Sequence, residues 1–594
     1  MLIRLQIDRQ EPFADGMAFG ATGSYVRLMG TAYGELDPQQ PLHAGIVNLD
    51  KAPRNARGRV EYDMDVYIMR PTDVTKGNHT ILYEVTNRGR KMLLPILHDA
   101  PETSPGAIND PATVADAGNG LAFQRGYTLV WSGWDPDAPR VHHGMRIRVP
   151  IATDNGYPLV QIIRDEFVFG TRVPTTRHTA PLSYEAATLD QGQARLTVRA
   201  GEADARRDIP SDRWTYADAR SIKLLPEGTA FQPGLIYDFW YPARDPQVLG
   251  IGFAATRDLV SFLRYETHDT VGNPNPLALS QTAPGIRAVL AFGNSQSGRY
   301  LRTHTALGFN QDEVRRRVFD GVLTNVSGIG KVFTNFAFGQ SYRTSTQHED
   351  HAFPENWFPF AHAPLTDPVT GQTGALRRED GFDPLIIEVN TSTEYWQKGA
   401  SLLHTTPPGT ADFALPASVR LYLMAGTQHG GRAGMSAVRG NGVHPRNPHN
   451  PTPALRALLV ALDQWVTQGE EPPASRIPQL ATGTLVPLER LQFPTLPGVQ
   501  VPRCMNRIVV LDDWVAPQCT PDNVYGALVP QAEREAHRDP RLSLAERYGS
   551  HATYVQKVTE AAQALVAERL LLPEDATHYV DEARRQTLLV TVQG

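Results

Sequence analysis

Apolar and polar residues alternate in the first part of the chain. Residues 60–69 (Val-Glu-Tyr-Asp-Met-Asp-Val-Tyr-Ile-Met) have the two-residue period of a β-strand with one side in water. Two continuous apolar runs, 81–85 and 127–131, end in turn residues, which is typical of buried strands. From about residue 135 to 250 short alternating strands recur, for example at 159–163, without a long helical period. The pattern predicts a β-rich opening and then a β-rich insertion.

Beyond residue 250 the pattern changes to strands and helices in alternation, interrupted by a stretch of roughly fifty residues rich in Phe and Pro. Such alternation indicates a parallel sheet covered by helices on both faces. In the tail, Ser543 and Glu546 form a possible capping pair before a further helix at 554–569, which we expect to pack on the core. The predicted strands are 286–292, 321–325, 385–389 and 419–425, and the predicted helices are 254–265, 298–307, 395–404 and 454–467.

The length of 594 residues suffices for one core with large additions, or for two to three domains. We expect six parts along the chain. They are 1–134 (β-rich start and first core strands), 135–250 (β-rich insertion), 251–328 (core), 329–380 (lid insertion), 381–470 (core) and 471–594 (C-terminal extension).

One strand-to-helix turn carries a candidate nucleophile. The predicted strand 286–292 runs directly into Gly-Asn-Ser-Gln-Ser-Gly-Arg, and a helix follows, which is the context of a nucleophile elbow. The residues two before and two after the nucleophile are crowded in such a turn, so both must be small. Around Ser295 they are Gly293 and Ser297, whereas around Ser297 they would be Ser295 and Arg299. The spacing therefore favours Ser295.

A base and an acid follow in the order that this kind of turn requires, which is nucleophile, acid, histidine. The last predicted strand, 419–425, ends close to His429, and a long helix comes after it. Glu394 lies just beyond the predicted strand 385–389, while Glu388 lies inside that strand and would point into the packing of the sheet. A serine hydroxyl is a weak nucleophile, so the imidazole must take its proton and the carboxylate must orient the imidazole. We predict a triad of Ser295, Glu394 and His429.

The developing oxyanion needs two backbone donors. One should be the amide of Gln296, and the other should come from the loop after the third core strand, where the amides of Arg88 and Gly89 are alternatives. Together these features predict the α/β-hydrolase fold, a mostly parallel doubly wound sheet with a β-rich insertion and a lid insertion.

Several residues near the predicted site are weaker candidates for binding a substrate. Asn87 lies in the same loop as the second donor, and Arg88, Arg90 and Arg299 surround the predicted mouth. These arginines could grip an acidic substrate, or pair with carboxylates of the scaffold. Four aromatic residues could line an apolar pocket, or pack in the core or lid. They are Trp131, Trp134, Trp357 and Phe360.

The chain resembles a bacterial family of alpha/beta hydrolase domain proteins whose substrates are poorly defined. The resemblance extends from residues 11–12 to 547–549, and its elbow is similar to those of the tannase and feruloyl esterase group, which cleaves esters of aromatic acids. It implies a carboxylic ester hydrolase, and many relatives carry an export signal. The runs that carry it are 83–91 (Tyr-Glu-Val-Thr-Asn-Arg-Gly-Arg-Lys), 130–134 (Val-Trp-Ser-Gly-Trp), 293–299, 393–396 (Thr-Glu-Tyr-Trp) and 426–430 (Gly-Thr-Gln-His-Gly).

The net charge and its distribution along the chain indicate which kind of molecule the protein binds. The formal net charge of −6 is small for this length and no block of like charges occurs, which argues against nucleic acid and for a small, mostly neutral substrate. No apolar run reaches about 18 residues, and charges interrupt the first ten residues, so we expect a soluble protein, cytoplasmic as written, or exported if a signal was removed. Nothing in the pattern indicates an oligomeric state.

We expect neither a metal nor another cofactor. His348-Glu349-Asp350-His351 does not have the His-Glu-x-x-His spacing, and a polar lid loop explains it. The two cysteines, Cys504 and Cys519, match no metal site and would be free thiols or one disulfide.

Two other functions use the same residues. An amidase or peptidase shares the triad chemistry, and a catalytically silent binding protein would share the fold. The presence of all three triad residue types in the expected order favours an enzyme.

Overall fold

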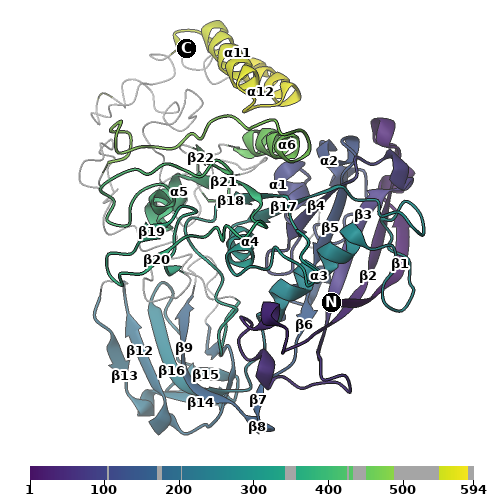
Figure 1. Ribbon diagram of the computed structural model, residues 1–594. Coiled ribbons are helices and arrows are strands. Elements are labelled where there is room, and N and C mark those ends of the chain that lie inside the picture. Colours follow the sequence, from purple (N-terminus) through teal and green to yellow (C-terminus); the bar gives the residue numbers. More distant parts are fainter. Residues whose placement is uncertain are drawn as a thin grey trace.

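The computed structural model describes residues 1–102, 106–169, 177–201, 204–341, 356–424, 427, 429–431, 450–486, 535 and 548–585. A ten-stranded sheet forms its centre, with the strand order β1-β2-β3-β5-β4-β17-β18-β21-β22 and with β6 beside β3 (Figure 1). The six strands from β5 to β22 are mutually parallel, and β1 to β3 extend the sheet in antiparallel fashion. The bounds are β1 Leu2–Pro12, β2 Tyr25–Leu36, β3 Val60–Pro71, β4 Thr80–Val85, β5 Thr128–Ser132, β6 Ile147–Arg148, β17 Ala288–Asn294, β18 Gly321–Asn325, β21 Leu385–Thr391 and β22 Val419–Met424.

The burial of the strands follows their place in the sheet. Every residue of the central strands β4, β5 and β18 is buried, as expected where helices cover both faces of a parallel sheet. In β1 buried and exposed positions are mixed, since this edge strand has one open side. The predicted doubly wound, mostly parallel sheet is confirmed.

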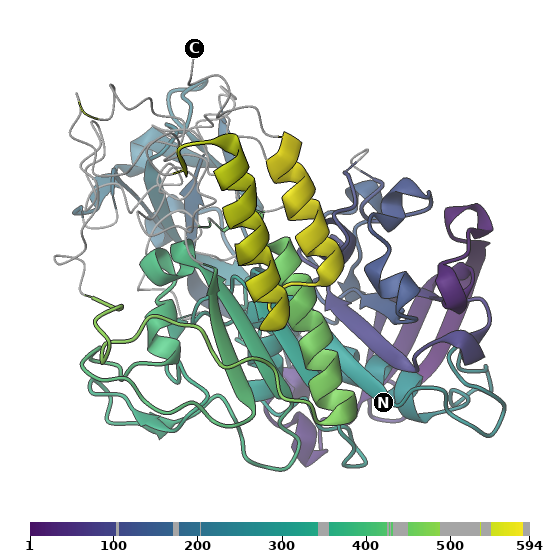
Figure 2. The same ribbon diagram turned by 90° about the horizontal axis from the view of Figure 1, so that it is seen from above.

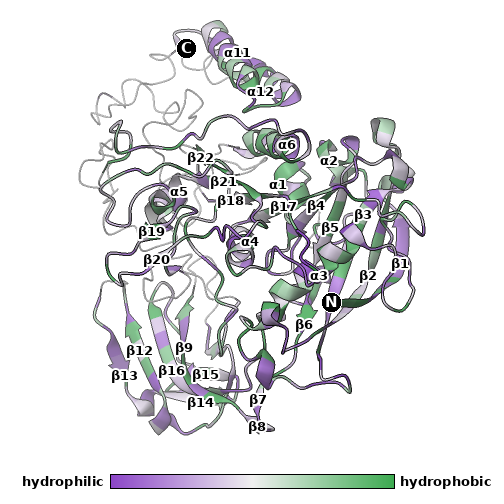
Figure 3. Ribbon diagram, viewed as in Figure 1, coloured by the Kyte–Doolittle hydropathy of each residue, from purple (hydrophilic) through white to green (hydrophobic). Residues whose placement is uncertain are grey.

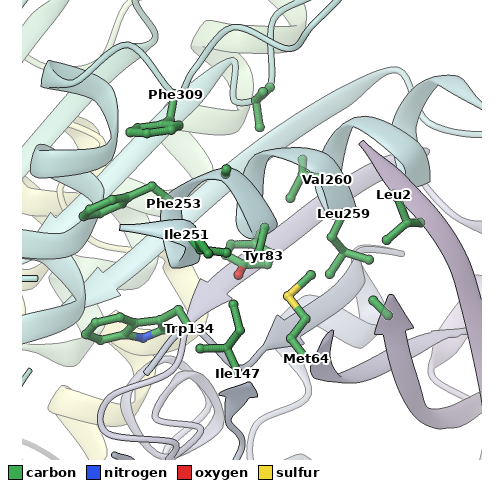
Figure 4. Close-up of a cluster of buried hydrophobic side chains, with 14 of the residues drawn as sticks. Leu2, Met64, Tyr83, Trp134, Ile147, Ile251, Phe253, Leu259, Val260 and Phe309 are labelled. Carbon is green, nitrogen blue, oxygen red and sulfur yellow. The ribbon is translucent and has the colours of Figure 1, made fainter. Parts of the chain in front are cut away.

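Two helical layers cover the sheet. Residues of α3 and α4 pack into one hydrophobic cluster with one face, and residues of α1, α2 and α6 pack into a second cluster with the other. Figure 4 shows part of the first cluster, where Leu259 and Phe253 of α3 lie near Tyr83 of β4. In Figure 3 apolar residues are frequent along central strands such as β4 and β5, and helices such as α11 and α12 carry both apolar and hydrophilic residues. The bounds are α1 Leu93–Leu97, α2 Leu121–Gln124, α3 Ile251–Tyr265, α4 Gln296–Ala306, α5 Ser392–Gln397 and α6 Thr452–Gln468.

The C-terminal helices α11 (His551–Ala567) and α12 (Pro573–Arg585) form a hairpin beside α6 (Figure 2). Leu570, in the turn between them, joins the second hydrophobic cluster. Asp575 pairs with Arg456 of α6 at 2.5 Å, and both side chains are largely buried. α11 lies at the position of the predicted tail helix, and α12 is a second helix that the sequence pattern did not indicate. Ser543 and Glu546 lie outside the described residues.

A separate β-rich region lies between β6 and α3. Its five-stranded and three-stranded sheets enclose an aromatic cluster in which the rings of Trp214 and Phe239 meet at 5.0 Å. The predicted insertion 135–250 contains this region, but β6 at its start belongs to the central sheet. The bounds are β7 Thr153–Asp154, β8 Tyr157–Pro158, β9 Val160–Val168, β10 Thr179–Pro181, β11 Glu185–Ala186, β12 Arg195–Arg199, β13 Arg207–Ile209, β14 Trp214–Asp218, β15 Ser221–Leu224 and β16 Ile236–Arg244, with the later hairpin β19 Leu365–Thr366 and β20 Thr373–Gly374.

None of the helices in the described part of the chain combines the length and the hydropathy that crossing a bilayer requires.

Candidate active site

Ser295 sits in a strained turn between β17 and α4. Its backbone has φ 58° and ψ −114°, in the positive-φ region that non-glycine residues rarely occupy. The amide of Ser295 donates to the carbonyl of Asn325 at the end of β18, at 2.7 Å. A Cβ at Gly293 would lie 2.5 Å from the carbonyl oxygen of Ser297, so only glycine fits there. This sharp turn presents the Ser295 side chain at the carboxyl edge of the parallel strands.

Ser295, His429 and Glu394 form one hydrogen-bonded line. The hydroxyl Oγ of Ser295 lies 2.9 Å from Nε2 of His429, and Nδ1 of His429 lies 2.6 Å from Oε1 of Glu394. A carboxylate only accepts, so Nδ1 carries the proton and Nε2 is left to accept from the serine hydroxyl. The amide of His429 also donates to Oγ1 of Thr393, at 3.2 Å.

Glu394 is fully buried at the start of α5. Thr391 and Glu394 make a capping box, in which the Thr391 amide donates to Oε2 of Glu394 at 2.9 Å and the Thr391 hydroxyl donates to the same oxygen. Burial opposes the negative charge, but the attraction of His429 and the hydrogen bonds from His429 and Thr391 outweigh it. The pKa of Glu394 is therefore below its usual value, and the carboxylate is ionised at neutral pH.

The loop after β4 forms a tight turn beside Ser295. The backbones of Asn87 and Arg90 exchange two hydrogen bonds, and the residues between them, Arg88 and Gly89, have φ of 51° and 77°. The side-chain amide of Asn87 donates to the carbonyl of Asn294, the residue before Ser295, at 3.0 Å. Asn87 thus ties this turn to the elbow.

Trp131 and Trp134 belong to the core, which is one of the two roles that the sequence left open. Trp131 is 0% exposed and Trp134 2%. The indole N–H of Trp134 donates to the carbonyl of Thr86 at 2.7 Å, and Figure 4 shows its ring among the buried side chains. The indole N–H of Trp131 donates to Glu84. Neither ring is exposed where it could line a substrate pocket.

The other candidates near the elbow differ in their exposure. Arg299 on α4 is 5% exposed and lies against Gly330, while Arg90 is exposed. Ser297 is buried, and its hydroxyl has no hydrogen-bond partner among the described residues. The ring of Trp357 packs edge-on against Phe336 at 5.5 Å, and Phe360 packs against the small cluster below β21 and β22.

Glu388 points into the packing of the sheet, as predicted. It is 1% exposed and forms a buried ion pair with Arg302 of α4, at 2.7 Å, and its other oxygen lies 2.9 Å from Nε2 of His362. Glu388 therefore links the helix that follows Ser295 to the insertion that contains His362.

Four residues that shape the site were not predicted from the sequence. They are Glu84, Asn325, Thr391 and Thr393. Through hydrogen bonds they hold, in the same order, Trp131, Ser295, Glu394 and His429. The Thr-Ser-Thr-Glu run at 391–394 is a capping-box signature and could have revealed Thr391. The others act through contacts between distant segments.

The described part of the chain contains no candidate metal site, because no three His, Cys, Asp or Glu side chains in it form a group that could hold an ion. His348 and His351 lie outside the described residues, as do Cys504 and Cys519.

Comparison with known proteins adds the family. Residues 188–581 match a family model described as "Alpha/beta hydrolase domain", a range that includes Ser295, Glu394 and His429 but not the loop after β4. Among solved structures, the chain is similar to a glucuronoyl esterase from Solibacter usitatus at 11% sequence identity and a TM-score of 0.24, with 71% of this chain and 81% of that chain covered. No curated protein matches the sequence.

Proposed function

Since the chain belongs to the alpha/beta hydrolase domain family, in agreement with the predicted fold class, we propose that it is a serine-dependent hydrolase of carboxylic esters. Ser295 is the nucleophile, His429 the general base and Glu394 the acid that orients the base. The observation that carries this proposal is the hydrogen-bonded line from Ser295 through His429 to a buried carboxylate, with distances of 2.9 and 2.6 Å.

The reaction proceeds in two stages. The Ser295 oxygen attacks the ester carbonyl while Nε2 of His429 takes the hydroxyl proton, which gives a tetrahedral oxyanion. His429 then returns the proton to the departing alcohol as the C–O bond breaks, and the acyl group remains on Ser295. A water molecule repeats both steps and releases the acid. The ionised Glu394 holds the Nδ1 proton and stabilises the imidazolium, so the cycle needs no cofactor.

Two backbone donors receive the oxyanion in this proposal. One is the amide of Gln296, the first residue of α4, and the other is the amide of Arg88 or Gly89 in the turn after β4. What supports the second donor is the bond from the Asn87 side chain to Asn294, which keeps the turn next to Ser295. Asn87, Trp131 and Trp134 then support the backbone of the site.

A fluorophosphonate probe tests the proposal, because it reacts with an activated serine hydroxyl. We expect one label, which peptide mapping places on Ser295. A panel of p-nitrophenyl esters, aryl esters and matching amides then distinguishes the alternatives. Ester turnover at least about a hundredfold above amide turnover supports an esterase, faster amide cleavage would indicate an amidase or peptidase, and an unlabelled protein inert towards every member would indicate a binding protein.

A further inference from the structure

Glu84 is an ionisable residue at a buried position in the sheet, where an apolar residue is expected. It lies near the end of β4, where all six residues are buried, and is itself 1% exposed. Its neighbours in register are Phe292 on β17 and Trp131 on β5. A carboxyl group buried in this way costs free energy unless its oxygens are satisfied. The reaction proposed above does not use Glu84 directly, so its presence needs another explanation.

The carboxylate of Glu84 joins the two ends of the loop that follows its own strand. Oε1 accepts from the amide of Met92 at 2.8 Å, and Oε2 accepts from the amide of Leu93 at 2.9 Å. Oε2 also accepts from the indole N–H of Trp131. Because the chain leaves β4 at Val85 and returns to Glu84 at Met92, these bonds close the loop that contains the turn at 87–90.

Further bonds hold the same turn from its other sides. The indole N–H of Trp134 donates to the carbonyl of Thr86 at 2.7 Å, and the amide of Met145 donates to the carbonyl of Gly89 at 3.0 Å. A turn with φ of 51° at Arg88 and 77° at Gly89 is a conformation that the surrounding structure must enforce. Glu84 itself accepts three hydrogen bonds, from the amides of Met92 and Leu93 and from the indole N–H of Trp131.

We propose that Glu84 is a positioning residue, whose carboxylate, with the indole N–H groups of Trp131 and Trp134, fixes the turn at 87–90 so that one of its backbone N–H groups faces the oxyanion beside Ser295. The inference rests on the proposed function. Its physical basis is the steep dependence of oxyanion stabilisation on geometry. Loss of one donor costs about 100- to 1,000-fold in rate, and a misplacement of about 1 Å costs about 100-fold.

The test is Glu84→Gln, which keeps the size of the side chain but replaces one accepting oxygen with an NH₂ group that faces N–H donors. With p-nitrophenyl acetate we expect the acylation rate at saturation to fall about 100-fold, while the half-saturating ester concentration changes less than about threefold, because ground-state binding does not use the oxyanion donors. Phenylboronic acid, which forms a tetrahedral adduct with an active serine, should bind weaker by a similar factor.

Trp134→Phe is the second variant, since it removes the indole N–H that donates to Thr86 and keeps a large apolar ring. Tyr241→Phe is the matched control. It removes buried hydrogen bonds to Asp165 and Tyr184 in the β-rich region, far along the chain from the turn, so it reproduces a general loss of stability. We expect both variants to melt cooperatively, and only Trp134→Phe to lose acylation rate and boronate affinity together.

Two failures are distinguishable. If the wild-type protein acylates and either folded variant at the turn keeps its full acylation rate and boronate affinity, the positioning role is overturned and the proposed function stands. If the wild-type protein is neither labelled on Ser295 nor active on any ester, the proposed function falls, and this inference falls with it.

Discussion

Nδ1 of His429 and Oε1 of Glu394 lie 2.6 Å apart, and the two residues differ sharply in exposure. The Glu394 side chain is 0% exposed, while the His429 side chain is 33% exposed. The carboxylate is held on its other oxygen by the amide and hydroxyl of Thr391. The carboxylate is therefore fixed by the scaffold, whereas the imidazole that is hydrogen-bonded to it stays partly open to solvent.

Glu394→Gln should fold normally and lose about a thousandfold or more in the acylation rate, because an amide can favour the wrong imidazole tautomer. Glu394→Asp should recover only part, since shortening the side chain by one methylene moves the carboxylate by about 1 Å, which costs roughly a hundredfold. Stopped-flow measurement of the acylation phase checks both. Tyr395→Phe is the control, because it removes only the bond from the neighbouring residue to His404. Unchanged acylation in Glu394→Gln would contradict the assignment of the acid.

Ser295→Ala should lower the rate by several orders of magnitude and abolish fluorophosphonate labelling. Ser297→Ala should keep most of the activity, and its melting temperature should change little. The Ser297 hydroxyl is buried without a hydrogen-bond partner among the described residues, so its removal leaves no new polar group unsatisfied. Steady-state rates and peptide mapping of the label decide between the two serines, and an inactive Ser297→Ala beside an active Ser295→Ala would reverse the assignment.

The parts of the fold that sequence could predict are those set by local pattern. The predicted strand 321–325 coincides with β18, and the predicted helix 454–467 differs from α6 by a few residues. The elbow pattern requires a small residue at Gly293, and in the structure a Cβ there would collide with the backbone at the start of α4. These features depend on neighbours within a few residues, which the sequence displays directly.

Other features depend on segments that only the fold brings together. The helix predicted at 395–404 begins earlier, at Ser392, because the capping box at Thr391 starts it, and it ends at Gln397, before Gly399 with φ 59°. Apolar rings alone could not tell whether Trp131 lines a pocket or packs in the core. The hydrogen bonds of Glu84 could not be predicted from the sequence, because one of its partners is Trp131, 47 residues away on another strand.

The Glu388–Arg302 pair should make stability depend on pH at the acid end. Burial opposes the charge of Glu388, but Arg302 and His362 outweigh this and lower its pKa to about 2 from about 4.5. A carboxyl whose pKa is depressed by folding stabilises the protein above its unfolded pKa, and this stabilisation is lost as pH falls from about 4.5 to about 2. The full effect is on the order of 3 kcal/mol.

Denaturant titrations of the free energy of unfolding at several pH values between 2 and 5 check this pH dependence. Glu388→Gln should remove much of the slope, and at neutral pH it should cost about 3–5 kcal/mol, because Arg302 stays buried without its charge partner. The double variant Arg302→Met with Glu388→Leu should be clearly more stable than Glu388→Gln. An unchanged slope in Glu388→Gln would show that another group causes it.

EDTA should leave ester turnover unchanged, because the proposed cycle moves one proton between Ser295, His429 and the substrate and needs no Lewis acid. Initial rates before and after dialysis against the chelator measure this. Loss of activity that zinc or another divalent ion restores would contradict the prediction and direct attention to His348 and His351.

Gly293→Ala tests the elbow itself, because the added Cβ would lie 2.5 Å from the Ser297 carbonyl oxygen and 2.6 Å from the Gly298 amide nitrogen. Both contacts are backbone atoms, so the turn must move and the Ser295 hydroxyl moves with it. We expect at least about a hundredfold loss in acylation rate and about 1–3 kcal/mol in stability. Gly430→Ala is the matched control. It is next to His429, yet the added Cβ would meet no atom of the described chain within 4 Å beyond its neighbours, so rate and melting temperature should hardly change. Equal losses of acylation rate in the two variants would mean that replacing any glycine near the site has this effect. Full activity in Gly293→Ala would contradict the claim that position 293 is too crowded for a Cβ.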